Sequence, residues 1–203
     1  MDGIKNEFIN FMENKYKNII LRKSIFYNCE YALRFDLHDI AMNKGNDEYF
    51  TESLHRADEL FYNVFCNCDE LYFIYRNGKI KWNDKIFKNI IGFHKKEIGI
   101  FNEENVYEEN FHTQLAVLKV TASRINYRKI LESINNTDFS SRKPRTGGEI
   151  YFIHIKDEII FNMYDDRGLD IVGTTKEIIK PYYLKYNKWL LEDNREKMNK
   201  IFK

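Results

Sequence analysis

The chain has 203 residues, with 32 basic and 31 acidic side chains and a formal net charge of +1. This length allows one domain, or at most two, with a core that needs no disulfide or metal to hold it together. The balanced charge argues against an overall electrostatic field for nucleic acid or an anionic membrane, and the aromatic content of 16% favours a binding surface, because tyrosine suits half-buried positions.

Hydrophobic spacing defines the elements expected in the first part of the chain. Apolar residues at three- and four-residue intervals predict an N-terminal helix within residues 1–22. Residues 31–37 alternate apolar and polar side chains, which predicts a half-buried strand with Arg34 and Asp36 on its polar face. A second helix is expected to begin at the capping residue Asp47 and to present an apolar stripe to the core.

The pattern is weaker in the middle of the chain. Residues 71–75 are rich in β-forming side chains and stop at the turn dipeptide of residues 77–78, so we expect a strand, with 80–82 as a candidate hairpin partner. From residue 83 to residue 110, glycines interrupt short apolar groups. We interpret residues 83–110 as an irregular insertion.

A regular pattern returns after this insertion. Residues 114–121 predict a strand, residues 127–134 a short helix, and residues 135–148 a loop. Residues 149–164 predict a β-hairpin, with one face in the core and the reverse face either covered by a helix or open to a ligand. The predicted core face consists of Ile150, Phe152, His154, Ile159, Phe161 and Met163, and the reverse face of Tyr151, Ile153, Ile160, Asn162 and Tyr164.

The most informative segment is a tight turn between two apolar strands, which completes a pair of hairpins over residues 149–173. Asp165 can open a type I turn, with Asp166 and Arg167 at its centre and Gly168 at positive φ. The alternative interpretation is functional: Asp165 and Asp166, together with Asp170, form an anionic cluster that Arg167 neutralises or extends outward as a recognition fork. Residues 174–203 are expected to form a C-terminal helical region.

This segment also carries a resemblance. The run from Tyr164 to Ile171 reads Tyr-Asp-Asp-Arg-Gly-Leu-Asp-Ile, and further matches occur in order along the chain: Leu33-Arg-Phe-Asp36, Tyr49-Phe50, Arg56-Ala57, Asn136-x-Asp138-Phe139, Tyr183-x-x-Tyr186-x-x-Trp189 and Arg195. In these residues the chain resembles a bacterial family, domain of unknown function 3885. The resemblance implies a single α+β domain and supplies no catalytic residues, because the family carries no established activity.

Cysteine usage and hydropathy suggest where the protein works. Three cysteines form an odd set, which predicts reduced thiols in the cytoplasm and no disulfide framework. The Cys66-Asn-Cys68 pair with His55 lacks the second ligand pair of a zinc site, so we assign no metal ligands and no cofactor. The longest apolar runs fall well short of the ~20 residues that cross a bilayer, so no membrane span is expected.

Two kinds of chemistry were considered for the polar residues. Arg142 and Arg145 lie beside a glycine pair and could contact an anion, but a solvated basic loop is the simpler explanation, and no nucleic-acid partner is expected. A metal-dependent phosphoesterase or nuclease would need the aspartates of the turn to converge with Asp36 or Asp138. His38-Asp39 is the one adjacent His-acid pair, but neighbours on a strand point to opposite faces.

The sequence therefore predicts a single α+β domain spanning residues 1–203, with a mainly antiparallel or mixed sheet packed by helices and long helices at both ends. The predicted function is a cytosolic bacterial protein-binding module, of the kind that immunity or antitoxin proteins use to inhibit a partner protein. The alternatives are a metal-dependent phosphoesterase and a structural domain without catalysis. The expected interaction surface consists of Asp165, Asp166, Arg167, Asp170, Tyr164 and Tyr151.

Overall fold

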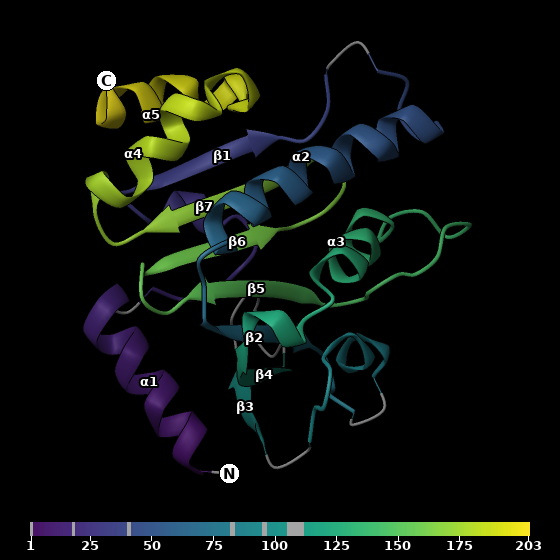
Figure 1. Ribbon diagram of the computed structural model, residues 1–203, viewed down its shortest axis with the longest axis vertical. Helices are drawn as coiled ribbons and strands as arrows, with labels where there is room; N and C mark the ends of the chain where they lie inside the picture. The colour runs from purple at the N-terminus through teal and green to yellow at the C-terminus, as the bar shows by residue number, and fades with distance from the viewer. Residues whose placement is uncertain (1, 18, 40–41, 82–83, 95–96, 105–111) are drawn as a thin grey trace.

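The computed structural model describes residues 2–17, 19–39, 42–81, 84–94, 97–104 and 112–203. A seven-stranded antiparallel sheet with the order β1-β7-β6-β5-β2-β4-β3 forms the centre of the molecule (Figure 1), so the predicted single α+β domain is confirmed. Its strands are β1 (Ala32–Asp36), β2 (Glu70–Asn77), β3 (Ile98–Glu104), β4 (His112–Thr121), β5 (Glu149–His154), β6 (Ile159–Met163) and β7 (Gly168–Gly173). Its helices are α1 (Asp2–Tyr16), α2 (Asp47–Phe65), α3 (Tyr127–Asn135), α4 (Lys176–Lys185) and α5 (Arg195–Phe202).

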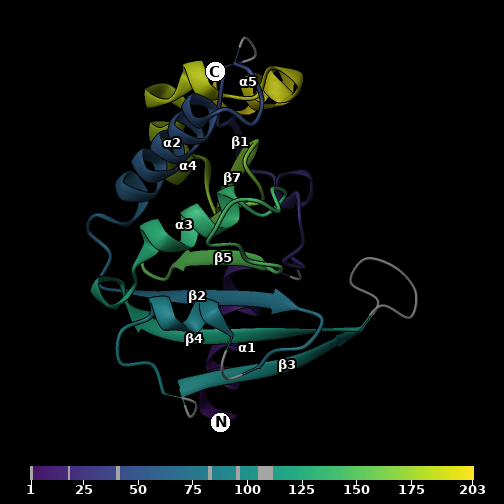
Figure 2. The ribbon, with the colours of Figure 1, turned by 90° about the vertical axis from the view of Figure 1, so that its right-hand side faces the viewer.

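The helices cover both faces and one edge of the sheet. Helices α2 and α3 lie on one face, whereas α1 packs on the other face against β3 and β4. Figure 2 shows α4 and α5 beyond β1 at one end of the sheet and β3 at the opposite edge. The chain after α4 also pairs with the β1 edge, because Leu191 N donates to Arg34 O at 2.9 Å. This contact closes an edge that would otherwise expose unpaired backbone groups.

Aromatic side chains form the core between α2 and the sheet. The Phe61 ring stacks on Tyr127 at 4.2 Å between centroids and meets Phe152 and Phe161 edge-on at 4.9 and 5.2 Å. The face of the β5–β6 hairpin predicted to lie in the core does so. On the reverse face, Tyr151, Ile153, Ile160 and Asn162 are buried as well, whereas Tyr164 is half-buried. Helix α1 packs on this side, with Phe8 5.2 Å from the ring of Tyr72 on the neighbouring strand β2, so most of the reverse face is covered rather than open.

Three boundaries differ from the sequence prediction, each for a local reason. Helix α1 ends at Tyr16, because Lys17 takes a positive φ of 38° that ends helical geometry. Helix α2 is capped by the side chain of Asn46, which accepts a hydrogen bond from Tyr49 N, and Asp47 is its first residue. Strand β2 pairs with β4 and β5 instead of forming a hairpin with residues 80–82, of which residue 82 lies outside the described part.

The segment predicted to be an irregular insertion contains regular structure. Residues Lys85–Asn89 form a 3-10 helix, and Ile98–Glu104 form the edge strand β3, paired along its length with β4. Residues 105–111 lie outside the described part. The prediction missed β3 because an edge strand buries few side chains and its outer half is polar, so its alternation is faint.

Two further observations concern membranes and thiols. In the described ranges, no helix combines the length and the apolar character needed to cross a bilayer. All three cysteines are free: Cys66 is exposed, whereas Cys29 and Cys68 are buried. Burial raises the pKa of the Cys29 and Cys68 thiols to about 12.

Candidate functional site

The turn between β6 and β7 has the local geometry that its aspartate predicts. Arg167 N donates to Asp165 Oδ1 at 2.9 Å, which is the bond from an aspartate to the amide two residues on, and Tyr164 N donates to Gly168 O at 3.2 Å. The Arg167 guanidinium folds back onto Asp165 Oδ2, with Nε at 3.1 Å. Burial opposes ionisation of Asp165, but the hydrogen bonds and the charge of Arg167 lower its pKa below the ordinary value.

Gly168 is required by packing and not by backbone conformation. The predicted positive φ at Gly168 is wrong, because this residue is the first residue of β7, in register with Asp36 of β1. A Cβ atom at this position would overlap the Tyr164 hydroxyl and ring. A larger residue at this position would therefore require the Tyr164 side chain to move.

Asp166 ties the turn to the two helices above the sheet. Its side chain is completely buried and accepts a short hydrogen bond from the Tyr49 hydroxyl of α2. Its main-chain carbonyl lies 2.8 Å from Ser53 Oγ, which also contacts the side-chain oxygen of Asn135 at the end of α3. Burial, followed by the hydrogen bond to Asp166, raises the pKa of Tyr49 well above its ordinary value, so Tyr49 is a donor at all physiological pH values.

This junction brings three aspartates together. Asn135 ends α3, and Asp138 lies three residues further along the chain, so fixing Asn135 near the turn also brings Asp138 close to it. One carboxylate oxygen from each of Asp138, Asp165 and Asp166 lies within 4.8 Å of the other two. Of the aspartates considered as metal ligands from the sequence, Asp165, Asp166 and Asp138 converge, whereas Asp36 and Asp170 are not part of this cluster.

Asp170 instead forms a buried ion pair with Arg34, its cross-strand neighbour on β1. Arg34 Nε and Nη2 donate to the two carboxylate oxygens at 2.7 and 2.8 Å, and Phe26 N donates to Oδ2 at 3.2 Å. The rings of Tyr27 and Tyr164 lie 4.7 and 5.2 Å from the guanidinium carbon. Burial alone would lower the pKa of Arg34, but the hydrogen bonds and charge of Asp170 raise it.

Most of the predicted interaction surface is therefore inside the molecule. Asp165, Asp166 and Asp170 are at most 1% exposed, and Tyr151 is fully buried with its hydroxyl 2.8 Å from Glu149 Oε2. The expectation that these side chains form one exposed surface is corrected by their burial, because the sheet has helices or ordered chain on both faces. Only Arg167, with 54% of its side chain exposed, and the half-buried Tyr164 remain accessible.

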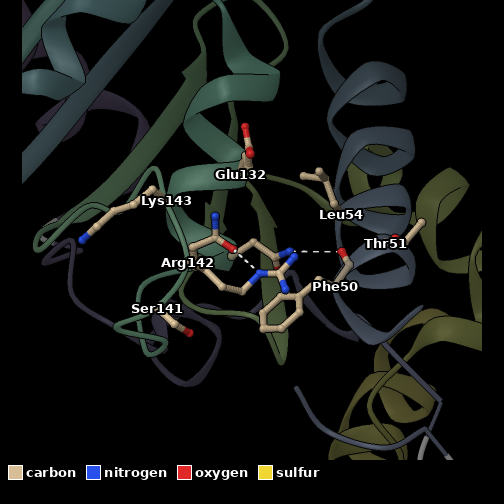
Figure 3. A pocket seen from close by; sticks show the side chains of 9 residues that line it. Phe50, Thr51, Leu54, Glu132, Ser141, Arg142 and Lys143 are labelled. Carbon is tan, nitrogen blue, oxygen red and sulfur yellow. Dashed lines mark hydrogen bonds between the residues drawn. The ribbon is translucent and has the colours of Figure 1, made fainter. Parts of the chain in front are cut away.

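The two arginines proposed as anion contacts lie in different environments. Arg142 lies across the Phe50 ring (Figure 3), 3.8 Å from guanidinium carbon to ring centroid. It also donates to Asp47 Oδ1 at 2.9 Å. It therefore closes one side of a cavity of about 380 Å³ and is already engaged. Arg145 is exposed and lines a separate cavity of about 760 Å³ between α3 and the 3-10 helix Lys85–Asn89. Four basic side chains and a single carboxylate line this second cavity: Lys85, Lys129, Lys143, Arg145 and Asp84.

A third pocket, missed by the sequence analysis, lies between α2 and the end of α4. The Trp189 ring stacks on Tyr186 at 5.1 Å, and His55 of α2 meets it edge-on at 6.4 Å. Tyr186 donates to Glu59 Oε1 at 2.9 Å. We call this the α2–α4 pocket. It has a volume of about 660 Å³ and is lined by His55, Glu59, Leu184, Lys185, Tyr186, Asn187, Lys188 and Trp189.

Hydrogen bonds from Arg195 fix the chain segment that forms one side of this pocket. Arg195 at the start of α5 donates to the carbonyl oxygens of Asn187 and Leu190 at 3.2 Å. Large apolar side chains nevertheless remain in solvent: Leu184 is 63% exposed, and Tyr62, on the same α2 face as His55 and Glu59 by its spacing, is 59% exposed. The signal available in the sequence was the spacing of Tyr183, Tyr186 and Trp189, which does not by itself show which of these rings face solvent.

Comparison with known proteins places the chain in a family. The model of the family described as Domain of unknown function (DUF3885) matches residues 8–194, so the chain belongs to that family. A relative, "Uncharacterized protein YnaE" of Bacillus subtilis (strain 168), is 24% identical over 207 residues, covering 91% of this chain and 97% of the relative. No solved structure matches the chain.

Proposed function

We propose that the protein is a protein-binding module that holds its partner at the α2–α4 pocket. The observation that carries this proposal is the exposure of Leu184 in a pocket that also contains the stacked Trp189–Tyr186 pair. Tryptophan, tyrosine and arginine dominate the residues that hold protein interfaces together, and they act best at the centre of a pocket that excludes water. The α2–α4 pocket offers that centre.

The charges around the pocket indicate the kind of partner. Glu59, Lys185 and Lys188 place both signs on its rim, and Lys185 Nζ lies 3.6 Å from Glu59 Oε1. A partner with a mixed-charge surface and one apolar side chain at its centre complements this arrangement. A strongly basic partner such as a nuclease would instead require this protein to present a predominantly acidic surface.

The narrower form of the proposal is that binding inhibits the partner, as immunity and antitoxin proteins do. We further propose that the module works in the bacterial cytoplasm, which the three free cysteines support, because a reducing compartment keeps such thiols unpaired. Inhibition predicts that the partner, expressed alone, is harmful or active, and that co-expression of this protein suppresses the effect.

The test compares two matched substitutions in tagged protein purified from its source cells. Leu184→Asp puts a charge into the α2–α4 pocket, whereas Ile91→Asp makes the same change at a residue that is 67% exposed and does not line this pocket. Both positions are exposed, so both variants should fold, which circular dichroism and thermal unfolding check. We expect a stoichiometric protein partner with wild type and Ile91→Asp and its loss with Leu184→Asp.

The proposal also defines how large the loss should be. Disrupting a residue at the centre of a small interface typically costs 2 kcal/mol or more, which corresponds to a roughly 30-fold weaker Kd. Equal recovery of the partner by both variants would contradict the proposed pocket, as would stoichiometric nucleic acid in place of a protein.

A further inference from the structure

We infer that Asp138, Asp165 and Asp166 form a binding site for a hard divalent cation such as Mg²⁺, Mn²⁺ or Ca²⁺. Each contributes one carboxylate oxygen to a group in which all three oxygens lie within 4.8 Å of one another. Three such oxygens around one point match the ligand preference of these ions, which take oxygen donors and complete their shells with water. The chain contributes Asp138 from the loop after α3 and the other two from the β6–β7 turn.

A second, independent observation is that one carboxylate oxygen of Asp166 is buried without a hydrogen-bond donor in the described part of the chain. Its side chain is completely buried, and Tyr49 donates to Oδ2. Oδ1 is also buried and has no hydrogen-bond partner among the described residues. A buried carboxylate oxygen without a donor is rare in native proteins, because it gives up water and gains nothing in return. A cation bound beside Asp138 and Asp165 supplies the missing interaction.

Arg167 occupies the position of a competing cation. Its guanidinium binds Asp165 Oδ2, and the hydrogen bond and charge of Asp165 raise the pKa of Arg167. Lys23 Nζ lies 3.7 Å from the same oxygen. The Arg167 side chain is 54% exposed, so it can turn into solvent when a divalent ion takes over Asp165 Oδ2. Asp165 Oδ1 keeps its bond from Arg167 N in either state, which preserves the turn.

The surroundings hold the ligands in place before any ion arrives. Ser53 of α2 lies within hydrogen-bond distance of both the Asp166 carbonyl and Asn135, so the turn and the end of α3 are fixed to the same residue. Asp138 is exposed, and it therefore leaves one side of the site open to water or to an oxygen ligand from another molecule. The cation site and the α2–α4 pocket share no lining residue, so the two proposals fail or succeed separately.

The experiment titrates chelator-treated protein with Mn²⁺, Mg²⁺ or Ca²⁺ alone, using calorimetry for stoichiometry and Mn²⁺ electron paramagnetic resonance for occupancy. Wild type is expected to bind one ion. Asp138→Asn changes an exposed ligand and should weaken binding at least about 10-fold, whereas Asp193→Asn, an exposed aspartate outside the cluster, should leave it unchanged. Arg167→Ala removes the nearer of the two cationic side chains at Asp165 Oδ2 and should tighten binding.

The Arg167 variant separates the cation site from a permanent internal ion pair. A lasting ion pair between Arg167 and Asp165 predicts that a divalent ion binds Arg167→Ala but not wild type, and that result would overturn the inference. It is also overturned if no ion binds to wild type at millimolar concentration, or if Asp138→Asn and Asp193→Asn bind with equal affinity. Circular dichroism of each variant confirms that a loss of binding does not reflect unfolding.

Discussion

Replacing Arg34 by methionine should destabilise the protein by about 3–5 kcal/mol, because it leaves the carboxylate of Asp170 buried without its partner. The ion pair is bidentate and its side chains are 7% and 0% exposed. Arg128 provides the matched control, since it also binds a carboxylate through two nitrogens, at 2.8 and 3.2 Å from Asp58, but its side chain is 70% exposed. Arg128→Met should therefore change stability little, because solvent screens an exposed pair.

Urea unfolding followed by circular dichroism measures the difference. With a slope of roughly 2–3 kcal/mol per molar urea for a chain of this size, the Arg34→Met midpoint should fall by about 1–2.5 M. The double variant Arg34→Met/Asp170→Leu should recover most of the loss, because replacing both charges removes the unpaired one. Equal midpoints for Arg34→Met and Arg128→Met, or a double variant as unstable as the sum of its single changes, would refute the reasoning.

Three more outcomes follow from local geometry. Gly168→Ala should lower the stability of the protein by about 1–3 kcal/mol. The double variant Gly168→Ala/Tyr164→Ala should recover part of that loss, and thermal unfolding of the single and double variants measures the difference. Burial lowers the pKa of His154 below its ordinary 6.5. Because the unfolded chain then binds more protons than the folded one, the free energy of unfolding should fall as the pH drops below 6.5. Urea titrations at several pH values should show a smaller loss for His154→Gln than for wild type. Iodoacetamide at pH 8 should label Cys66 alone in native protein, as intact mass reports, because both other thiols are buried and protonated.

Local chemistry made parts of the turn predictable from the sequence. In a turn, an aspartate side chain commonly accepts a hydrogen bond from the amide two residues on, and Asp165 does so with Arg167. Gly168 was predicted for the wrong reason, because the need for glycine comes from the Tyr164 side chain folding back over β7. Such a contact depends on packing, which no dipeptide preference encodes.

Burial of charge was the main feature that the sequence concealed. Alternation placed Arg34 on a polar strand face, yet its partner Asp170 is 136 residues away and becomes a neighbour only through the β1–β7 pairing. The meeting of Asp138 with the turn depends in the same way on Ser53 and Asn135. Sequence spacing can propose charged residues for a site, but the sheet register decides which of them meet.

The α2–α4 pocket was missed for a related reason. The sequence predicted only a helical region over residues 174–203, without a pocket, and Tyr186 in this region is buried. Whether Leu184 and Trp189 also face solvent depends on where α4 lies against α2, which hydrophobic spacing does not determine. The helices and the β5–β6 hairpin were predictable because their periodicity is strong and their boundaries are set by local caps and turns.

The measurement closest to the central claim is hydrogen–deuterium exchange of the protein alone and in complex with its co-purified partner. Binding at the α2–α4 pocket predicts slower exchange at residues 184–189 and along the α2 face that carries His55, Glu59 and Tyr62, with the β6–β7 turn unchanged. Protection confined to the β6–β7 turn, or to the basic cavity around Arg145, would contradict the account and move the binding surface to that site.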